Sequence, residues 1–232
     1  MHTVLQAEIR PPMLIEGGRK FHIRSYLLVV EEPAEDDEDE ADTADNSQYH
    51  HQSSCPTVPV AYLFGRHEIR LAYKPVQGND SFDNNVDADP RNSQAHITNN
   101  SHTQMHLLRD FEELVDHYDA LEHFLCKIVH HLYPDLERRV RMAQSSYPPS
   151  FAPKFSLAGL DIMMTGDGRF YLLEVNVNPS VPKEDSVTPT YRQHLLGFWR
   201  DLMDTVLNEE GERREDNCFV ETEVILEDGR NS

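Results

Sequence analysis

The sequence lacks the features of a secreted or membrane protein. It contains three cysteines in 232 residues, Cys55, Cys126 and Cys218, and their spacing fits neither a disulfide framework nor a zinc motif. No apolar run approaches the roughly 20 residues that cross a membrane, and the first residues have neither the basic nor the apolar region of a signal peptide. We therefore expect a soluble protein of a reducing compartment, the cytoplasm.

Basic residues are scarce as well. The chain has 21 Lys and Arg against 41 Asp and Glu, which gives a formal net charge of −20. Residues 31–45 hold ten acids, residues 201–232 hold eleven, and the remainder is nearly neutral with 20 acids and 18 bases. Because phosphate contacts need a basic excess, this balance argues against a nucleic-acid-binding protein. We expect a disordered acidic insert at 31–57 and an acidic tail at 208–232.

The most informative stretch is 157–179, LAGLDIMMTGDGRFYLLEVNVNP. Two apolar runs of strand length, 157–164 and 169–177, flank the sequence TGDG at 165–168. An Asp-Gly break between two such runs is typical of a β-hairpin. The sequence therefore predicts that these two runs pair as antiparallel strands.

Two acidic residues fall on one face of this hairpin. With regular pairing from the turn, Asp161 lies opposite Leu172, and Glu174 is a diagonal neighbour about 7–8 Å away on the same face. Asn176 follows Glu174 on that face. Acids on strands are usually solvated, but these strands are otherwise nearly all apolar, as in a buried sheet, where an unpaired carboxylate is costly. Two carboxylates and an amide oxygen would suit Mg²⁺, which prefers oxygen ligands.

The string LLEVNVNPS, whose glutamate follows the aspartate of GLDIMM by thirteen positions, resembles the metal-binding hairpin of the tubulin-tyrosine-ligase-like family of ATP-grasp ligases. Three segments agree in order: GGRKFHIRSYLLV at 17–29, HEIRLAY at 67–73 and AHITNNS at 95–101. The resemblance covers about 1–207, apart from the insert, and only the carboxy-terminal half of that family's catalytic unit. It implies an α+β fold, the ATP-grasp carboxy-terminal subdomain, in which a mostly antiparallel sheet packs with helices.

The resemblance also implies roles for individual residues. Asp161, Glu174 and Asn176 would hold Mg²⁺ between the phosphates of ATP. Arg24 and Arg70 would be catalytic and stabilise the transferred group, because a guanidinium gives directed donors to phosphate oxygens. The nucleotide-binding residues would be Gln6, Ile9, Lys20, Thr98 and Asn99.

Some of these positions have simpler interpretations when the residues are taken alone. Residues 4–9 fit an edge strand without a ligand, and Thr98-Asn99 fits a turn or a helix cap. Lys20, His22 and Arg24 alternate along one strand and could form a solvated sheet face. The family normally has an aspartate at the position of His22, so this residue departs from its pattern.

Hydrophobic periodicity predicts the remaining elements. Apolar residues at three- and four-residue steps within 105–142 predict a helix that ends near Pro134, followed by a shorter helix. The same periodicity predicts a helix at 189–207, and 218–226 could add a strand. Runs of strand type lie at 4–9, 19–30, 58–64 and 67–73.

Metal ligands on one hairpin and cationic donors on neighbouring strands are equipment for phosphoryl transfer. The resemblance implies an ATP-dependent ligase in which a carboxylate becomes an acyl phosphate and an amine then displaces the phosphate. The expected reaction adds Tyr, Glu or Gly to a protein acceptor such as tubulin, which would place the protein at microtubules or cilia. A second interpretation is a non-catalytic ATP-grasp-like module, a pseudoenzyme or fragment that binds tubulin or another partner, because of His22 and because the preceding half of the catalytic unit is not represented.

Overall fold

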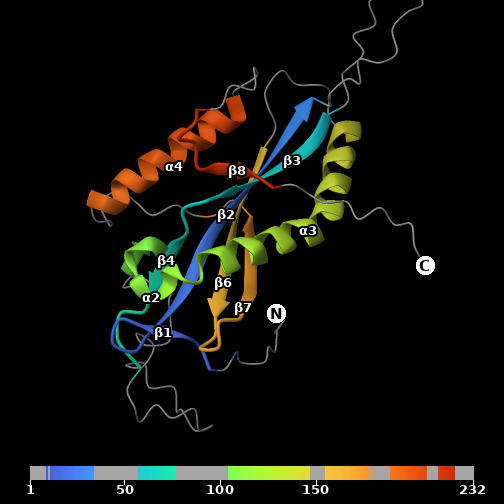
Figure 1. The fold of residues 1–232 in the computed structure, drawn as a ribbon. Helices are drawn as coiled ribbons and strands as arrows, with labels where there is room; N and C mark the ends of the chain where they lie inside the picture. The colour runs from blue at the N-terminus through green and yellow to red at the C-terminus, as the bar shows by residue number, and fades with distance from the viewer. Residues whose placement is uncertain are drawn as a thin grey trace, which may run out of the picture.

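The computed structural model describes residues 9, 11–33, 57–76, 104–146, 155–177, 179, 189–207 and 214–222. The first five elements are strands, and helices alternate with further strands after them (Figure 1). The elements in chain order are β1 (Leu14–Ile15), β2 (Arg19–Pro33), β3 (Thr57–Phe64), β4 (Glu68–Leu71), β5 (Gln104–Leu107), the 3₁₀ helix η1 (Leu108–Asp110), α2 (Glu112–Val115), α3 (Tyr118–Ser146), β6 (Phe155–Met164), β7 (Phe170–Val177), α4 (Pro189–Leu207) and β8 (Phe219–Glu221).

The long strand β2 organises the sheet. Along one edge it pairs with β4 near its start and with β3 near its end, and along the other edge it pairs with β6. β5 extends the sheet beyond β4, β8 beyond β3 and β7 beyond β6. All these pairings are antiparallel, so the predicted fold class, an antiparallel sheet packed with helices, is confirmed.

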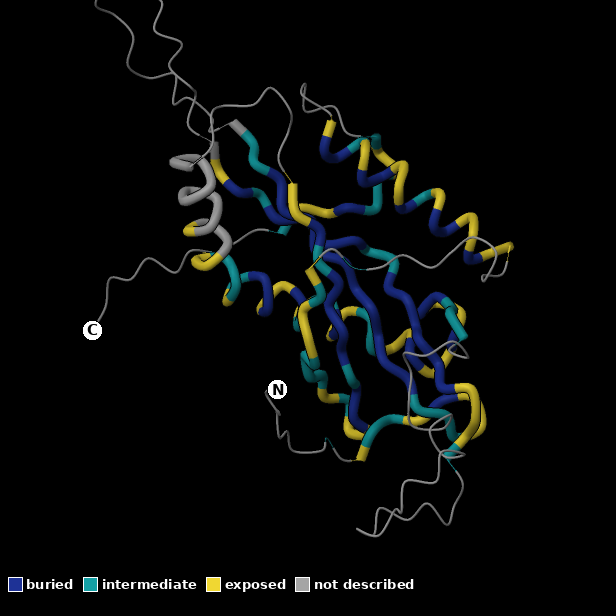
Figure 2. The backbone as a smooth tube through the Cα atoms, turned by 180° about the vertical axis from the view of Figure 1, so that it is seen from behind, coloured by how far each residue is buried: buried dark blue, intermediate teal, exposed yellow. Residues whose placement is uncertain are grey.

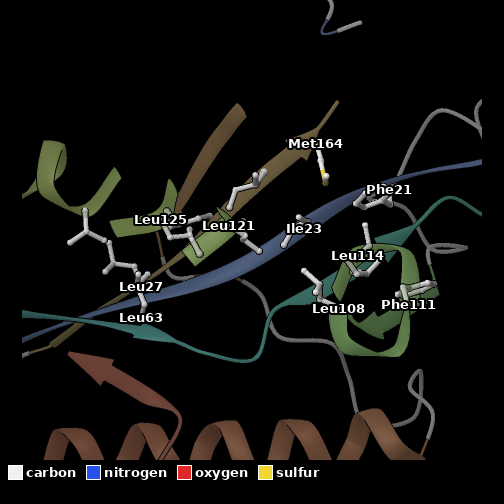
Figure 3. Packing of buried hydrophobic residues seen from close by; sticks show 14 of the residues in the cluster. Phe21, Ile23, Leu27, Leu63, Leu108, Phe111, Leu114, Leu121, Leu125 and Met164 are labelled. Carbon is white, nitrogen blue, oxygen red and sulfur yellow. The ribbon is translucent and has the colours of Figure 1, made fainter. Parts of the chain in front are cut away.

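Helices cover both faces of this sheet, with α3 on one side and α4 on the other (Figure 1). Phe21, Ile23 and Leu27 of β2 pack with α2 and α3 (Figure 3). Tyr26 and Leu28, which point to the opposite face, pack with α4. Two separate hydrophobic clusters therefore hold the helices to the sheet.

Because both of its faces are covered, β2 is buried without interruption from Phe21 to Val30, as Figure 2 shows. Three residues in this stretch are polar: His22, Arg24 and Ser25. A buried polar side chain needs partners, since an unsatisfied one costs free energy. The partners of these residues define the polar sites described below.

The helical prediction for 105–142 was wrong in two places: residues 105–107 belong to the strand β5, and α3 continues through Pro134 to Ser146. A proline removes one helical hydrogen bond and crowds the preceding turn. Pro134 is exposed, so its ring lies on the solvent side of the helix. The neighbouring Tyr133 hydroxyl donates to the Pro59 carbonyl of β3 at 3.0 Å and fastens α3 to the sheet at this point.

The limits of several other predicted segments change. Residues 31–33 belong to β2 and Thr57 to β3, so the expected insert narrows to 34–56, outside the described residues. The expected strand at 4–9 is likewise outside them, apart from Ile9. The helix at 189–207 is confirmed, and the strand expected within 218–226 is β8. In the described part of the chain, no helix is long and apolar enough to cross a membrane.

Candidate active site

Four charged residues form a row across four neighbouring strands. Arg24 of β2 lies opposite Glu68 of β4 on one side and opposite Asp161 of β6 on the other. Asp161 in turn lies opposite Glu174 of β7. Residues directly opposite in an antiparallel sheet have Cβ atoms about 4.5–5.5 Å apart and project from the same face. The row therefore places one cation among three acids on the face that carries α4.

The predicted pairing of Asp161 with Leu172 was wrong. Leu172 pairs with Ile162, and the register shifts between Ile162 and Asp161, which leaves Leu173 as an extra residue in β7. This is a β-bulge, and bulges are common beside active sites because they redirect a side chain. The hairpin also closes at Met164 and Phe170, one residue later than expected, and this shift together with the bulge places Glu174 directly opposite Asp161, closer than the predicted diagonal position.

Asp161 and Arg24 form a buried, two-point ion pair. The Arg24 Nε donates to Asp161 Oδ1 at 2.5 Å and Nη2 donates to Oδ2 at 2.9 Å. Both residues are nearly inaccessible, with Arg24 3% and Asp161 4% exposed. His22 lies beside them, with Nε2 at 3.5 Å from Asp161 Oδ1. Burial alone would raise the pKa of Asp161, but the adjacent His22 side chain and the hydrogen bonds and charge of Arg24 hold it well below the usual value.

Gly159 of β6 provides the space that the Arg24 side chain occupies. A Cβ atom on Gly159 would lie 2.8 Å from Arg24 Nη1 and 3.1 Å from its Cδ, as well as 3.0 Å from Pro179 Cβ. Real Cβ atoms essentially never lie within 3.0 Å of another atom, and contacts of 3.0–3.1 Å are unusually tight. The lack of a side chain at Gly159 therefore leaves room for the Arg24 guanidinium, a role that the sequence alone did not indicate.

Asn176 completes the group of predicted metal ligands. Its Nδ2 donates to Asp161 Oδ2 and to Glu174 Oε1, both at 2.9 Å, so the three side chains converge. The prediction that they share one face is thus met by the geometry. Glu174 is exposed, which leaves this corner of the site open to solvent.

The donor set at this corner fits a hard cation. In the described residues no group of three His, Cys, Asp or Glu side chains is placed to hold a metal. A metal at this corner would therefore have two carboxylate ligands, Asp161 and Glu174. Magnesium is commonly held by one or two carboxylates, with phosphates and water completing its shell. Turning the Asn176 amide over would add its oxygen to the set. These residues are therefore a suitable seat for Mg²⁺.

Of the other predicted ligand-binding residues, some lie on the face of the site and others lie outside the described residues. Arg70 of β4 is buried and lies opposite His22, so it projects from the same face as Arg24. Lys20 is half-buried two residues before His22, also on that face. Ile9 is half-buried. The predictions for Gln6, Thr98 and Asn99 lie outside the described residues.

Glu68 is a further member of the site to which the sequence assigned no role. It is 1% exposed, and both its carboxylate oxygens accept from the Tyr26 hydroxyl at 3.2 Å. His194 Nε2 of α4 lies 3.3 Å from Glu68 Oε1. Burial, followed by the charge of Glu68, raises the pKa of Tyr26. The structure shows in addition that α4 is docked on this acid.

Comparison with known proteins bears on the fold. No family model matches the chain, and no curated protein matches its sequence. Among solved structures it is similar to the C-terminal domain of K. lactis Pby1, described as an ATP-grasp enzyme that interacts with the mRNA decapping enzyme Dcp2. The TM-score is 0.54 at 16% identity, over 91% of this chain and 50% of the other, so this chain spans about half of that structure. The chain therefore has a fold similar to about half of this C-terminal domain of an ATP-grasp enzyme.

Proposed function

We propose that the chain is the carboxy-terminal half of an ATP-dependent ligase that joins an amino acid to a protein acceptor through an acyl phosphate. The observation that carries the proposal is the convergence of Asp161, Glu174 and Asn176 beside Arg24, on a sheet with the ATP-grasp fold. Carboxylates for a cation next to guanidinium groups for phosphate are what phosphoryl transfer requires.

Each side chain has a role that follows from its position. Arg24 and Arg70 present guanidinium groups from adjacent strands to the same face, where they would bind the oxygens of the transferred phosphoryl group. Lys20, on the same strand and face as Arg24, would bind the other phosphates. Bound Mg²⁺ would neutralise phosphate charge at Asp161 and Glu174. Catalysis here rests on positioning and on charge neutralisation.

The amino acid and the acceptor are proposed on the resemblance of LLEVNVNPS and HEIRLAY to tubulin-tyrosine-ligase-like enzymes. The candidates are Tyr, Glu or Gly added to tubulin or to another protein, in the cytoplasm. We propose tubulin first, because that family modifies it.

The test is a ligation assay with the full-length protein, tubulin, Mg-ATP and labelled Glu, Gly or Tyr. We expect Glu174→Gln to abolish incorporation of the label, because an amide is a much weaker ligand for Mg²⁺ than a carboxylate. Asp167→Asn is the matched control. It removes one negative charge from the turn of the same hairpin, where Asp167 pairs with Arg169 and not with the site.

A readout that needs no turnover accompanies this assay. Mg-ATP should raise the melting temperature of the parent and of Asp167→Asn, and should do so less for Glu174→Gln, since a ligand that binds only the folded state stabilises it. Incorporation by Glu174→Gln at the rate of Asp167→Asn would contradict the metal assignment.

The second candidate is a binding module that has lost turnover. The observation that favours it is His22, which is buried 3.5 Å from Asp161 at a position where the resembling family has an aspartate. This candidate predicts a Mg-ATP-dependent rise in melting temperature without incorporation of any labelled amino acid. His22→Asp should then restore incorporation if the histidine alone is responsible.

A further inference from the structure

A pocket lies away from the row of charges. It has a volume of about 480 Å³ and opens where the β3–β4 turn, η1, the start of α3 and the segment before β8 meet. Pockets that bind small molecules have volumes of about 300–1,000 Å³. Its lining includes none of Arg24, Arg70, Asp161, Glu174 and Asn176, so it is separate from the candidate active site.

The charge of this pocket is opposite to that of the chain. The chain has a net charge of −20, yet the ten lining residues include no Asp or Glu and include Arg66 and Arg109. Within the described residues, neither guanidinium forms a hydrogen bond or an ion pair with a carboxylate. Two guanidinium groups that have no direct carboxylate partner among the described residues therefore border this cavity.

The backbone of the pocket is held in place by the elements around it. The Gly65 N–H donates to the Cys218 carbonyl at 2.8 Å, and the Leu108 N–H donates to the His67 carbonyl at 2.9 Å. The Tyr118 hydroxyl donates to the Gly65 carbonyl. These three bonds join the β3–β4 turn to β8, η1 and α3, so the cavity is formed before any ligand binds.

The titratable groups of the lining add no negative charge to the pocket, although Glu122, just outside the lining, contacts His67 and Tyr118. Burial raises the pKa of the Cys218 thiol, more than the nearby Arg66 lowers it, so the thiol stays neutral at physiological pH. Burial and the neighbouring Glu122 raise the pKa of Tyr118 to about 12, so its hydroxyl keeps the proton. His67 is engaged on both nitrogens, by Ser25 at 2.9 Å and by Glu122 at 2.6 Å.

We propose that this pocket binds the carboxylate or phosphate group of a small molecule through Arg66 and Arg109. The planar guanidinium forms two parallel hydrogen bonds with either anion, and such charge-assisted bonds are about twice as strong as neutral ones. The Leu107 and Leu108 side of the cavity would take the less polar part of the molecule. The volume suits an amino acid or a sugar phosphate rather than a large peptide.

The test is an NMR titration of the full chain with two probes, inorganic phosphate and the dipeptide Glu-Glu. We expect saturable shifts of the Gly65 and Leu108 amides with at least one probe, and the stronger binder tells phosphate from carboxylate. Arg66→Gln and Arg109→Gln should each raise the dissociation constant about tenfold or more, since a hydrogen bond to a charged group contributes about 1.5–3 kcal/mol. Arg138→Gln, which removes an exposed arginine of α3, is the matched control.

Three results would overturn the proposal. The first is the absence of saturable shifts at Gly65 and Leu108 with both probes. The second is a dissociation constant that changes no more in Arg66→Gln and Arg109→Gln than in Arg138→Gln. The third is a loss of these shifts in Glu174→Gln, because that would assign the anion to the candidate active site. Failure of the ligation assay leaves all three measurements unaffected.

Discussion

The buried pair of Arg24 and Asp161 is the central residue-scale feature of the candidate site. Burial of two charges is costly, and their attraction compensates only when the geometry is good. Here two hydrogen bonds at 2.5 and 2.9 Å meet that condition. A hydrophobic pair of similar volume would often serve stability as well, so this ion pair is not required for folding stability alone.

Removal of one partner should therefore be strongly destabilising. We expect Arg24→Met to lower the free energy of unfolding by about 3–5 kcal/mol, because Asp161 would remain as a buried, uncompensated charge. Urea denaturation followed by circular dichroism measures this. The control is Arg138→Met, which breaks the exposed pair with Asp135 at 2.6 Å and should cost no more than about 1 kcal/mol. Equal losses in the two variants would contradict the claimed importance of burial.

The same pair should impose a pH dependence on stability. The pKa of Asp161 in the folded chain lies well below its ordinary value of 3.8, so the unfolded chain binds the proton more readily. The contribution is therefore complete above the ordinary pKa and is lost as the pH falls toward the folded pKa. We expect the stability difference between the parent and Asp161→Asn to be constant from about pH 7 to about pH 5 and to shrink below about pH 4. Urea titrations at each pH test this, and an unchanged difference in the acid range would refute it.

Gly159 offers a test that leaves both charges in place. Gly159→Ala would put a methyl group 2.8 Å from Arg24 Nη1, whose side chain is fixed by Asp161. We expect a loss of about 1–3 kcal/mol in the free energy of unfolding, the usual cost of overpacking. Gly166→Ala is the control, because its new methyl group would meet nothing closer than 3.9 Å, and it should change stability by less than about 1 kcal/mol. Thermal denaturation of the two variants side by side gives the comparison.

At the scale of elements, α4 holds the end of the described chain against the sheet. Asp201 of α4 is fully buried and accepts from Arg200 at 2.9 Å, from Arg214 at 2.8 Å and from the Cys218 N–H at 3.3 Å. Cys218 leads directly into β8, which pairs with β3. One carboxylate thus connects the helix, the segment at 214–218 and the last strand.

Asp201→Ala should release β8 before the rest of the fold. We expect amide hydrogen exchange at Phe219–Glu221 to become at least about tenfold faster, as loss of a buried carboxylate leaves its donors unsatisfied at a cost of about 1–3 kcal/mol each. Asp216→Ala is the control from the same segment, because Asp216 is exposed and contacts Arg200 only at 3.3 Å. Equal protection of β8 in both variants would show that Asp201 does not anchor it.

Sequence patterns predicted these elements well where periodicity governs them. Alternation along 19–30 placed Lys20, His22 and Arg24 on one face, and the apolar steps of 189–207 gave α4. Two features lacked such a signal. The sequence pattern of β7 does not reveal the extra residue at Leu173, so the direct pairing of Asp161 with Glu174 was not predicted. The role of Gly159 depends on a side chain from another strand, 135 residues away, and no local pattern reports that.

At the scale of the whole molecule, the two faces of the sheet differ in composition. Hydrophobic clusters fill both, but the polar row lies only on the face of α4 and runs outward to β7. Among the described residues, β7 has no strand on its outer side, and Glu174 and Asn176 reach solvent there. Ligands therefore have access to the row from this edge, while its other end is closed by Glu68 and α4.

In the site without ligands, Arg24 and Asp161 neutralise each other's charge through their two hydrogen bonds. Asp161 cannot turn toward a cation without freeing the guanidinium, and Arg24 cannot turn toward a phosphate without freeing the carboxylate. If the chain is the ligase we propose, the divalent ion and the nucleotide should assist each other's binding, because either one breaks the contact that obstructs the other. Such reciprocity is a thermodynamic linkage: whatever factor the ion contributes to nucleotide affinity, the nucleotide must return to the ion.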